Sequence, residues 1–253
     1  MERPDAFLPD WTDAAAYASL VAADRTILAW EWLRRIPAYR EASRAGGADE
    51  PDAALGWGLH RFEDPWRAAP LARPIWTATA LVPVLRTEMH GCDDPADALP
   101  ASLRRLAARH RDGRAVRMLL CDGWRAVRLD GVGRSGAGAG PRLVFTVAGP
   151  PALSPSLLAL RRLDALIRHG RFAGTLHPPV PRAARMLLLL RTADALAAGA
   201  RQREIAGVLL RGDVRGPGWR EEHPHLRLQA QRLVRDARRY LSGGYRALLR
   251  PRA

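Results

Sequence analysis

Apolar residues recur at a helical spacing near the start of the chain. In the segment DRTILAWEWLRRIPAYR, Ile27, Trp30 and Leu33 stand at positions i, i+3 and i+6, and Pro37 follows them. This spacing places the three side chains on one face of a helix that ends before the proline. The next stretch, residues 46–75, is rich in glycine and proline and is predicted to be irregular coil or a linker.

The period of the pattern changes in the middle of the chain. Three segments of β-forming residues lie between glycine-bearing turns: AVRMLLC (115–121), WRAVRLD (124–130) and RLVFTVA (142–148). They predict a three-stranded antiparallel meander over about 115–148. The G-x-G-x-x-G stretch at 131–136 leads into a strand, whereas a dinucleotide site would have to open a helix there. We therefore interpret it as a hairpin loop.

From residue 154 onward the pattern is helical. Ser154 and Pro155 predict a helix start, and Gly170, Gly199 and Gly243 predict helix stops.

One of these segments, ARQREIAGVLLRG (200–212), is typical of the first half of a helix-turn-helix, with Gln202 just ahead of Ile205 and Ala206. The stretch that follows, DVRGPGWREEHPH (213–225), is longer than the usual three- or four-residue turn. We expect Trp219 to fill the gap between the two helices.

The last helical segment divides into an apolar face and a basic face at 100° per residue. The basic face consists of Arg227, Gln231, Arg235 and Arg238, with Arg232 and Arg239 just beyond. A solvated helix face usually mixes charges, but Asp236 is the sole acidic residue from 224 to 252. This face therefore predicts contacts with DNA, in which Gln231 reads a base edge. Arg201, Gln202 and Arg203 are expected to contact backbone phosphates.

Charge is distributed unevenly along the 253 residues. All 40 basic residues are Arg, and the total net charge is +14. Residues 1–100 hold 10 Arg and 16 acidic residues, whereas residues 101–253 hold the other 30 Arg and 10 acidic residues. A GC-rich genome explains Arg in place of Lys but not this asymmetry. The asymmetry indicates a polyanionic partner for the second half, or attraction between the halves.

Motifs for catalysis or metal binding are weak. HGCDD (90–94) lacks a second pair of ligands and is interpreted as a polar loop, and HPH (223–225) as a helix start. No nucleophile elbow, P-loop or zincin motif occurs, so neither an enzyme nor a cofactor or metal is expected. Two cysteines without a C-x-x-C motif, an acidic start and no long apolar run predict a cytoplasmic protein outside the membrane.

Both ends of the chain resemble a known family of regulators. The segments DWTDAAAYASLVAADRTILAWEWLRRIPAYR (10–40) and WGLHRF (57–62) resemble the transcriptional-regulator-like domain of FseA-type activators. The segments RQREIAGVLLRG and LRLQAQRLVRDARRYLSGGYRALL (226–249) resemble their companion domain. The resemblance implies an activator of excision and transfer genes of integrative and conjugative elements. The implied partners are promoter double-stranded DNA, RNA polymerase and an acidic QseM-like antiactivator.

These observations predict a mainly α-helical fold with a small antiparallel β-meander and a C-terminal helix-turn-helix variant with an extended turn. The expected domains are residues 1–75, a helical regulator-like domain with its linker, and 76–253, whose helical part spans about 154–253. Trp30 and Leu33 are expected to dock on the C-terminal helices, since a unit of residues 1–45 cannot bury them alone. The alternative function is a protein-interaction regulator whose basic half binds an acidic protein and not DNA.

Overall fold

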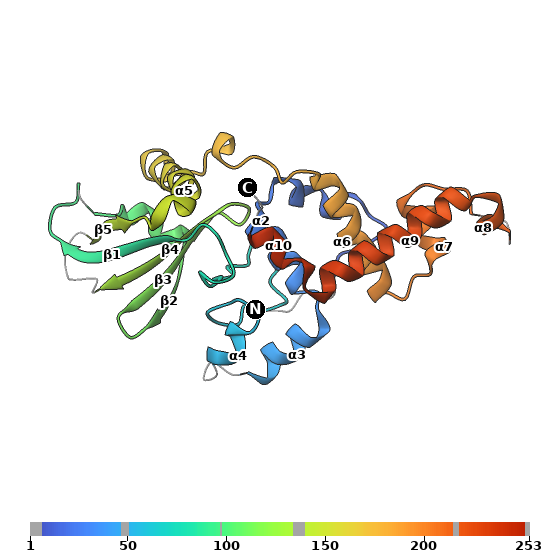
Figure 1. Cartoon of the computed structure of the whole chain (residues 1–253), viewed down its shortest axis with the longest axis horizontal. Helices are drawn as coiled ribbons and strands as arrows, with labels where there is room; N and C mark the ends of the chain where they lie inside the picture. Colours follow the sequence, from blue (N-terminus) through green and yellow to red (C-terminus); the bar gives the residue numbers. More distant parts are fainter. Residues whose placement is uncertain (1–6, 47–50, 97, 134–139, 215–217, 251–253) are drawn as a thin grey trace.

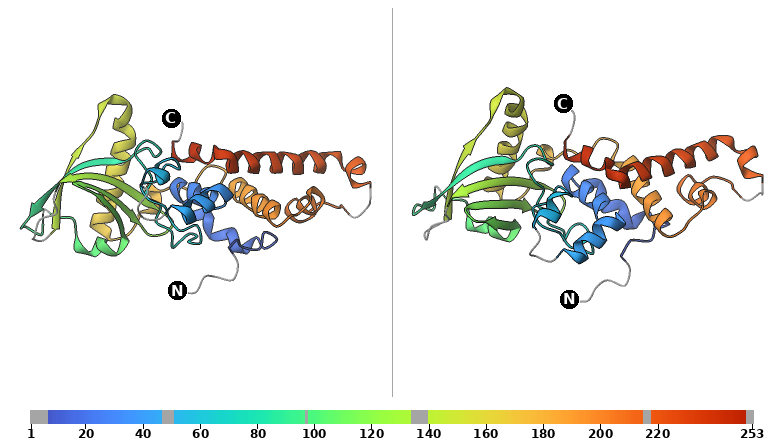
Figure 2. Two further views of the ribbon diagram at one scale, coloured as in Figure 1. Left: turned by 90° about the horizontal axis from the view of Figure 1, so that it is seen from below. Right: turned by 60° about the horizontal axis from the view of Figure 1, so that its bottom comes forward.

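The computed structural model describes residues 7–46, 51–96, 98–133, 140–214 and 218–250. The molecule is elongated, with a β-sheet and helix α5 at one end and helices α7 to α9 at the other (Figure 1). The N-terminal helices and the C-terminal helix α10 lie side by side between these two ends (Figures 1 and 2).

The N-terminal helices are α1 (Ala15–Ala18), α2 (Arg25–Leu33), α3 (Pro37–Ala45) and α4 (Pro51–Leu55), with a 3₁₀ turn at Ser19–Ala22. Asp24 caps α2, because its carboxylate accepts hydrogen bonds from the backbone N–H groups of Thr26 (2.9 Å) and Ile27 (3.1 Å). The helix predicted from the apolar spacing is confirmed, and Pro37 stands in the first turn of the next helix.

Residues 46–75, predicted to be coil or a linker, include helix α4; the part after α4 is mostly irregular and is not a linker. The indole of Trp30 donates a hydrogen bond to the carbonyl of Arg67 (2.8 Å), and the ring of Trp57 packs edge-on against Tyr39. Leu59 is fully buried. The segment therefore covers α2 and α3 and belongs to their hydrophobic core.

The β-sheet has five strands in the order β2-β3-β4-β1-β5. They are β1 (Leu85–Cys92), β2 (Ala107–Asp112), β3 (Ala115–Cys121), β4 (Ala126–Gly133) and β5 (Gly140–Thr146), and a 3₁₀ turn at Ala101–Leu106 precedes β2. The three predicted strands correspond to β3, β4 and β5, but the antiparallel meander is wrong. Strand β1 lies between β4 and β5, parallel to β4 and antiparallel to β5, so β4 and β5 do not form a hairpin.

Strand β1 also overturns the prediction of a polar loop at 90–94, because His90 and Cys92 belong to it. Gly133, at the end of the G-x-G part of the motif, pairs with Met89 of β1 and has φ of +137°. A Cβ at this position would clash with the Met89 carbonyl oxygen. The glycine thus permits close approach of two strands; residues 134–139 of the predicted loop lie outside the described residues.

Helix α5 (Gly149–His169) covers one face of the sheet (Figure 2). Leu163 and Leu166 are buried in one cluster with Leu85 and Leu129 of the sheet. The predicted start at Ser154 and Pro155 is wrong, because prolines in the first turn begin the helix earlier and Pro155 lies inside it. The predicted stop is confirmed: Gly170 adopts a left-handed conformation with φ of 64°.

The C-terminal helices are α6 (Ala183–Ala197), α7 (Gln202–Leu209), α8 (Trp219–Glu222), α9 (Pro224–Arg239) and α10 (Arg246–Leu249), and a 3₁₀ turn at Gly174–Leu176 precedes them. A π-helical turn at Tyr240–Gly244 joins α9 to α10, and Gly243 has φ of 109° there. The predicted helix stop at Gly243 is therefore confirmed: the helical conformation is interrupted there by a kink, and α10 follows it. Gly199, with φ of 80°, follows the end of α6.

One hydrophobic core joins the N-terminal and C-terminal helices. The indole of Trp32 stacks on Tyr240 with ring centroids 4.7 Å apart, and its N–H donates to the sulfur of Met186 at 3.2 Å. Leu248 and Leu249 of α10 are buried in the same core, and α10 packs on α2. The two ends of the chain therefore share one interior.

A buried ionic cluster crosses this interface. Asp194 of α6 accepts hydrogen bonds from Arg35 Nε (2.7 Å), Arg35 Nη2 (2.9 Å) and the Tyr17 hydroxyl (2.6 Å). Arg35 also donates to the carboxylate of Glu31 at 2.6 Å. Burial, reinforced by the Asp194 carboxylate, raises the pKa of Tyr17, so the hydroxyl stays protonated and donates. Every charge in the cluster thus has a partner.

We expect Asp194→Ala to lower the free energy of unfolding by about 3–5 kcal/mol, because it leaves the Arg35 guanidinium buried without its carboxylate. Urea denaturation followed by circular dichroism measures the effect. Asp164→Ala is the matched control: its ion pair with Arg168 has a similar distance, 2.8 Å, but both side chains are more than half exposed. This control should cost less than about 1 kcal/mol. Equal losses in the two variants would contradict the prediction.

Candidate nucleic-acid interface

Helices α6, α7 and α9 pack against one another at the end of the molecule away from the sheet (Figure 1). Helix α7 begins after a short link, and the Arg201 N–H donates to the carboxylate of Glu204 at 2.6 Å, which satisfies a free donor at the helix start. Ile205 and Ala206 are fully buried. The apolar side of α7 thus faces the core, and Arg201 and Arg203 remain exposed.

The connection from α7 to α9 is held to both helices. Arg203 Nε donates to the carbonyl of Val214 at 2.6 Å, and the Gly212 N–H donates to the carbonyl of Ala206 at 3.2 Å. A Cβ on Gly212 would lie 2.6 Å from a methyl carbon of Leu226, so the chain passes close to the start of α9. Residues 215–217 of this connection lie outside the described residues.

Trp219 is the anchor of this connection. It is 4% exposed and forms a cluster with Ala206 of α7 and with Leu226 and Ala230 of α9. The expectation that Trp219 fills the gap between the two helices is confirmed. Helix α8, which begins at this residue, continues into α9 through His223, and Pro224 stands in the first turn as predicted for the HPH stretch.

The outer face of α9 is formed by the side chains that neither α6 nor α7 covers, and all of them except Leu228 are polar. The exposed residues between 225 and 239 are His225, Leu228, Gln229, Gln231, Arg232, Arg235, Arg238 and Arg239. Arg227 differs from the other residues of the predicted basic face, because it is only half exposed and its Nε is buried without a hydrogen-bond partner. The exposed arc is consequently centred on Arg232 and Arg239, which stood at the edge of the predicted face.

The acidic residue on α9 leaves most of these arginines unneutralised. Asp236 pairs with Arg185 of α6 at 3.1 Å and is 3.6 Å from Arg235. Arg232 and Arg238 form no ion pair or hydrogen bond with any described residue. Their guanidinium groups are therefore available to an anionic partner.

The predicted residues on α7 have different surroundings. Gln202 is half exposed and stands at the first position of the helix, whereas Arg203 is engaged with the connecting segment through Val214.

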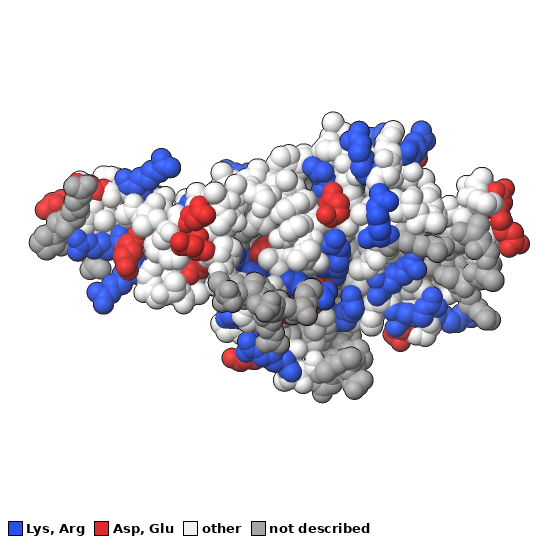
Figure 3. All heavy atoms as spheres, turned by 180° about the vertical axis from the view of Figure 1, so that it is seen from behind, with Lys and Arg blue, Asp and Glu red and all other residues white. Residues whose placement is uncertain are grey.

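Positive charge also extends beyond these helices: on the face seen in Figure 3, arginine side chains gather over the half of the molecule that carries α5 and the sheet.

The residues predicted as an interdomain contact are both fully buried. The indole N–H of Trp30 donates to Arg67 and its ring contacts Tyr39, so its polar and aromatic contacts are within the N-terminal part. Trp32, which the sequence pattern did not single out, contacts Met186 and Tyr240 of the C-terminal helices. Trp30 and Leu33 both belong to the core that the N-terminal and C-terminal helices share.

Two segments of the chain match known families of regulators. Residues 10–67 match the Proteobacterial transcriptional regulator-like domain, and residues 148–250 match the family described as "T6SS, Transcription factor, DNA binding domain". No curated protein and no solved structure matches the chain significantly. Together, the two matches support a DNA-binding transcriptional regulator.

The matches divide the structure in a specific way. The first covers α1 to α4, and the second covers α5 to α10. The strands of the sheet lie between them, outside both matched segments. In the described ranges, no cluster of His, Cys, Asp and Glu is arranged to hold a metal ion, and none of the described helices is long and apolar enough to span a membrane.

We expect Trp219→Ala to lower the free energy of unfolding by about 3–5 kcal/mol, because it opens a cavity between α7, α8 and α9. Trp219→Phe retains an aromatic ring in the cluster and should cost less than half as much. Both values can be measured by urea denaturation with far-ultraviolet circular dichroism. A loss below about 1 kcal/mol in the alanine variant would show that Trp219 does not anchor the connection.

Proposed function

We propose that the protein binds double-stranded DNA through an extended-turn helix-turn-helix, in which α7 supports α9 and α9 faces the duplex. The observation that carries this proposal is the outer face of α9, where exposed arginines stand with little acidic charge. It lies in the segment that matches a transcription-factor DNA-binding domain. Arginine binds phosphate oxygens and guanine edges, so this composition suits a nucleic-acid surface.

The contacts differ along α9. In helix-turn-helix proteins the N-terminal part of the recognition helix reaches the bases. Gln229 and Gln231 are exposed in that half of α9, and an amide can bond adenine through two atoms. Arg232, Arg235 and Arg238 follow them and are placed to bind phosphates. Arg201 and Gln202 at the start of α7 are proposed to contact the backbone.

We further propose that the regulator is an activator with RNA polymerase as a partner, and that it controls excision and transfer genes of an integrative and conjugative element. This finer assignment rests on the resemblance to FseA-type activators, which also implies an acidic antiactivator as partner. The family matched by residues 148–250 carries "T6SS" in its description, which points to a different set of genes. Mapping the bound promoters in the source organism distinguishes the two gene sets.

A protein-interaction regulator is the second candidate. Leu228 is 46% exposed among the arginines of α9, and Val208 of α7 is 40% exposed, so the surface offers apolar contacts as well as charge. An acidic protein would then take the place of DNA. The salt dependence of DNA binding separates the two candidates.

Replacing arginines of α9 should weaken binding to every DNA sequence and reduce its dependence on salt. Each lost phosphate contact removes about 0.9 from the slope of log K against log salt, so Arg238→Ala should flatten the slope by about one unit. Fluorescence anisotropy with a random duplex over a range of NaCl concentrations measures it. Arg168→Ala, an exposed arginine on α5, is the control and should leave the slope unchanged.

The same titration can reject the proposal. Replacement of Arg232, Arg235 and Arg238 together by Glu should abolish binding while circular dichroism shows an intact fold, because all three side chains are exposed. A wild-type slope near zero, or unchanged binding by the triple variant, would exclude α9 as the DNA-facing element. Tight binding of an acidic protein in place of DNA would then favour the second candidate.

Replacing Gln231 should have a different effect. Gln231→Ala should reduce discrimination between a duplex selected by the protein from a random pool and an unrelated duplex by about 1–3 kcal/mol, with the salt slope retained. Gln229→Ala, measured on the same two duplexes, shows whether the neighbouring exposed glutamine shares this role. Equal loss of affinity for both duplexes after Gln231→Ala would mean that its amide reads no base.

A further inference from the structure

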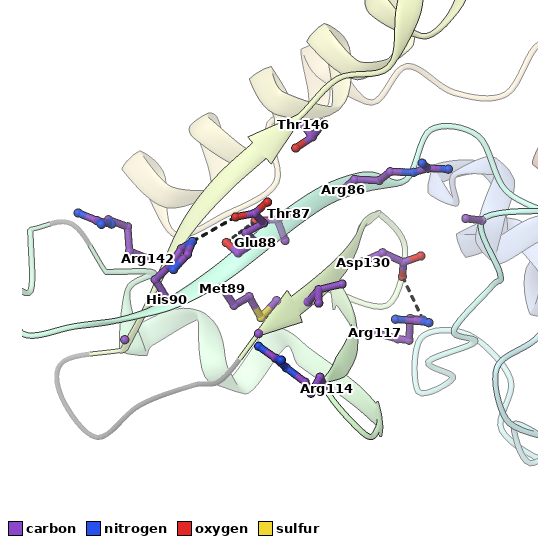
Figure 4. A pocket seen from close by; sticks show the side chains of 14 residues that line it. Arg86, Thr87, Glu88, Met89, His90, Arg114, Arg117, Asp130, Arg142 and Thr146 are labelled. Atoms are coloured by element: carbon purple, nitrogen blue, oxygen red, sulfur yellow. Dashed lines mark hydrogen bonds and ion pairs between the residues drawn. The ribbon is translucent and has the colours of Figure 1, made fainter.

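The face of the sheet opposite α5 carries an open cavity of about 1110 Å³. Along β1 the burial alternates, so that Leu85, Thr87 and Met89 are buried, whereas Arg86, Glu88 and His90 are exposed. Figure 4 shows side chains from several strands around this cavity, with His90 paired to Glu88 and Arg117 paired to Asp130. The sheet thus has one apolar face that α5 covers; on the opposite face, Leu119 and Cys121 join the core of the N-terminal helices, and the cavity occupies the remaining, charged part.

Three arginines surround a single carboxylate on this face. Asp130 of β4 stands directly opposite Arg86 of β1 and directly opposite Arg117 of β3, so the three side chains share one face. A third guanidinium, that of Arg128, lies 2.7 Å from the carboxylate of Asp130. Positive charge therefore exceeds negative charge at this point of the sheet.

The hydrogen-bonding capacity of these arginines is unequally used. Arg128 is buried and donates to the carbonyl of Trp76 at 3.0 Å, and it also holds Asp130. Arg117 Nε is 3.7 Å from Asp130, too far for a hydrogen bond, and is buried without another partner. Arg86 forms no hydrogen bond or ion pair through its side chain with any described residue. Two guanidinium groups therefore have free donors beside the cavity.

We propose that this cavity binds a small anionic molecule through a carboxylate or phosphate group held by Arg86 and Arg117. Neighbouring strands are about 4.8 Å apart, so the backbones of these two residues lie about 10 Å apart across β4, and two long side chains can reach one anion between them. Guanidinium groups bind such anions through paired hydrogen bonds. The remaining part of the bound ligand would lie over Val132 and Thr146, which line the same cavity.

The surroundings favour a small molecule over DNA at this place. Glu88 and Asp130 line the cavity and confine its excess positive charge to a small area, which suits a single compact anion held beside Asp130 better than a continuous phosphate backbone. The sheet lies at the end of the molecule opposite α9 (Figures 1 and 2) and outside both matched segments. The cavity is therefore separate from the proposed DNA-binding surface.

The test is titration of the full chain with succinate and, separately, with inorganic phosphate at constant ionic strength maintained with NaCl. Saturable heat by calorimetry and a rise in melting temperature are the readouts. Wild type should bind at least one of the two probes, and Arg86→Ala should weaken that binding at least tenfold. Arg109→Ala, an exposed arginine on β2 outside the cavity lining, should change it less than twofold.

Arg86→Ala is the decisive variant, because Arg117→Ala also removes a neighbour of Asp130. The Arg86→Ala variant should keep the wild-type melting temperature without ligand and keep DNA binding, so loss of anion binding cannot be attributed to unfolding. Absence of saturable binding of both probes by the wild type would overturn the proposal. So would equal binding by Arg86→Ala and Arg109→Ala, or competition by random duplex DNA with the bound probe.

Discussion

The arrangement of the helices depends on the buried carboxylate of Asp194. It receives hydrogen bonds from Arg35, in the turn between α2 and α3, and from Tyr17 of α1, while Asp194 itself belongs to α6. Apolar side chains would tolerate a small shift of α6 along α2, but these directional bonds are lost by such a shift. Since α7 and α9 both pack on α6, the position of the candidate DNA-binding surface follows from this contact.

Glu31 completes the cluster from the side of α2. Burial alone would raise the pKa of its carboxyl, but the guanidinium groups of Arg34 and Arg35 lower it below the usual value. The group is therefore a carboxylate that holds Arg35 in place and also accepts the backbone N–H of Ala69 at 2.8 Å. Through Ala69, the same cluster fixes part of the irregular segment that the sequence had presented as a linker.

Much of the fold could be predicted where the residue pattern within one segment is sufficient to determine its secondary structure. The run of apolar β-formers in β3 and the apolar spacing in α2 each determine one element. Strand β1 was missed because Arg86, Glu88 and His90 alternate with its buried residues, and charged side chains suggest a loop when the opposite face is unknown. Its place between β4 and β5 depends on contacts between distant segments, such as that of Met89 with Gly133, which local patterns do not contain.

The candidate DNA-binding site could likewise be predicted only as far as the pattern of a single helix allows. The helical spacing identified the basic side of α9, yet it could not tell how much of that side α6 and α7 cover. Arg227 is consequently half buried, and Gln229 is exposed although the predicted face excluded it. The helical spacing predicted a contact of Trp30 with the C-terminal helices, but it did not single out Trp32, whose indole stacks on Tyr240 and donates to Met186.

The kink at Gly243 links the orientation of α9 to the packing of α10 on α2. Helix α9 has 16 residues and is therefore about 24 Å long. Its C-terminal end continues through the kink into α10, which packs on α2. A tilt of roughly 5° at the C-terminal end displaces the N-terminal end, together with α7 and α8 that pack there, by about 2 Å, given that length. Hydrogen bonds to base edges tolerate much less than this. The position of the glutamines that are proposed to read bases is thus set in part by packing at the opposite end of the same helix.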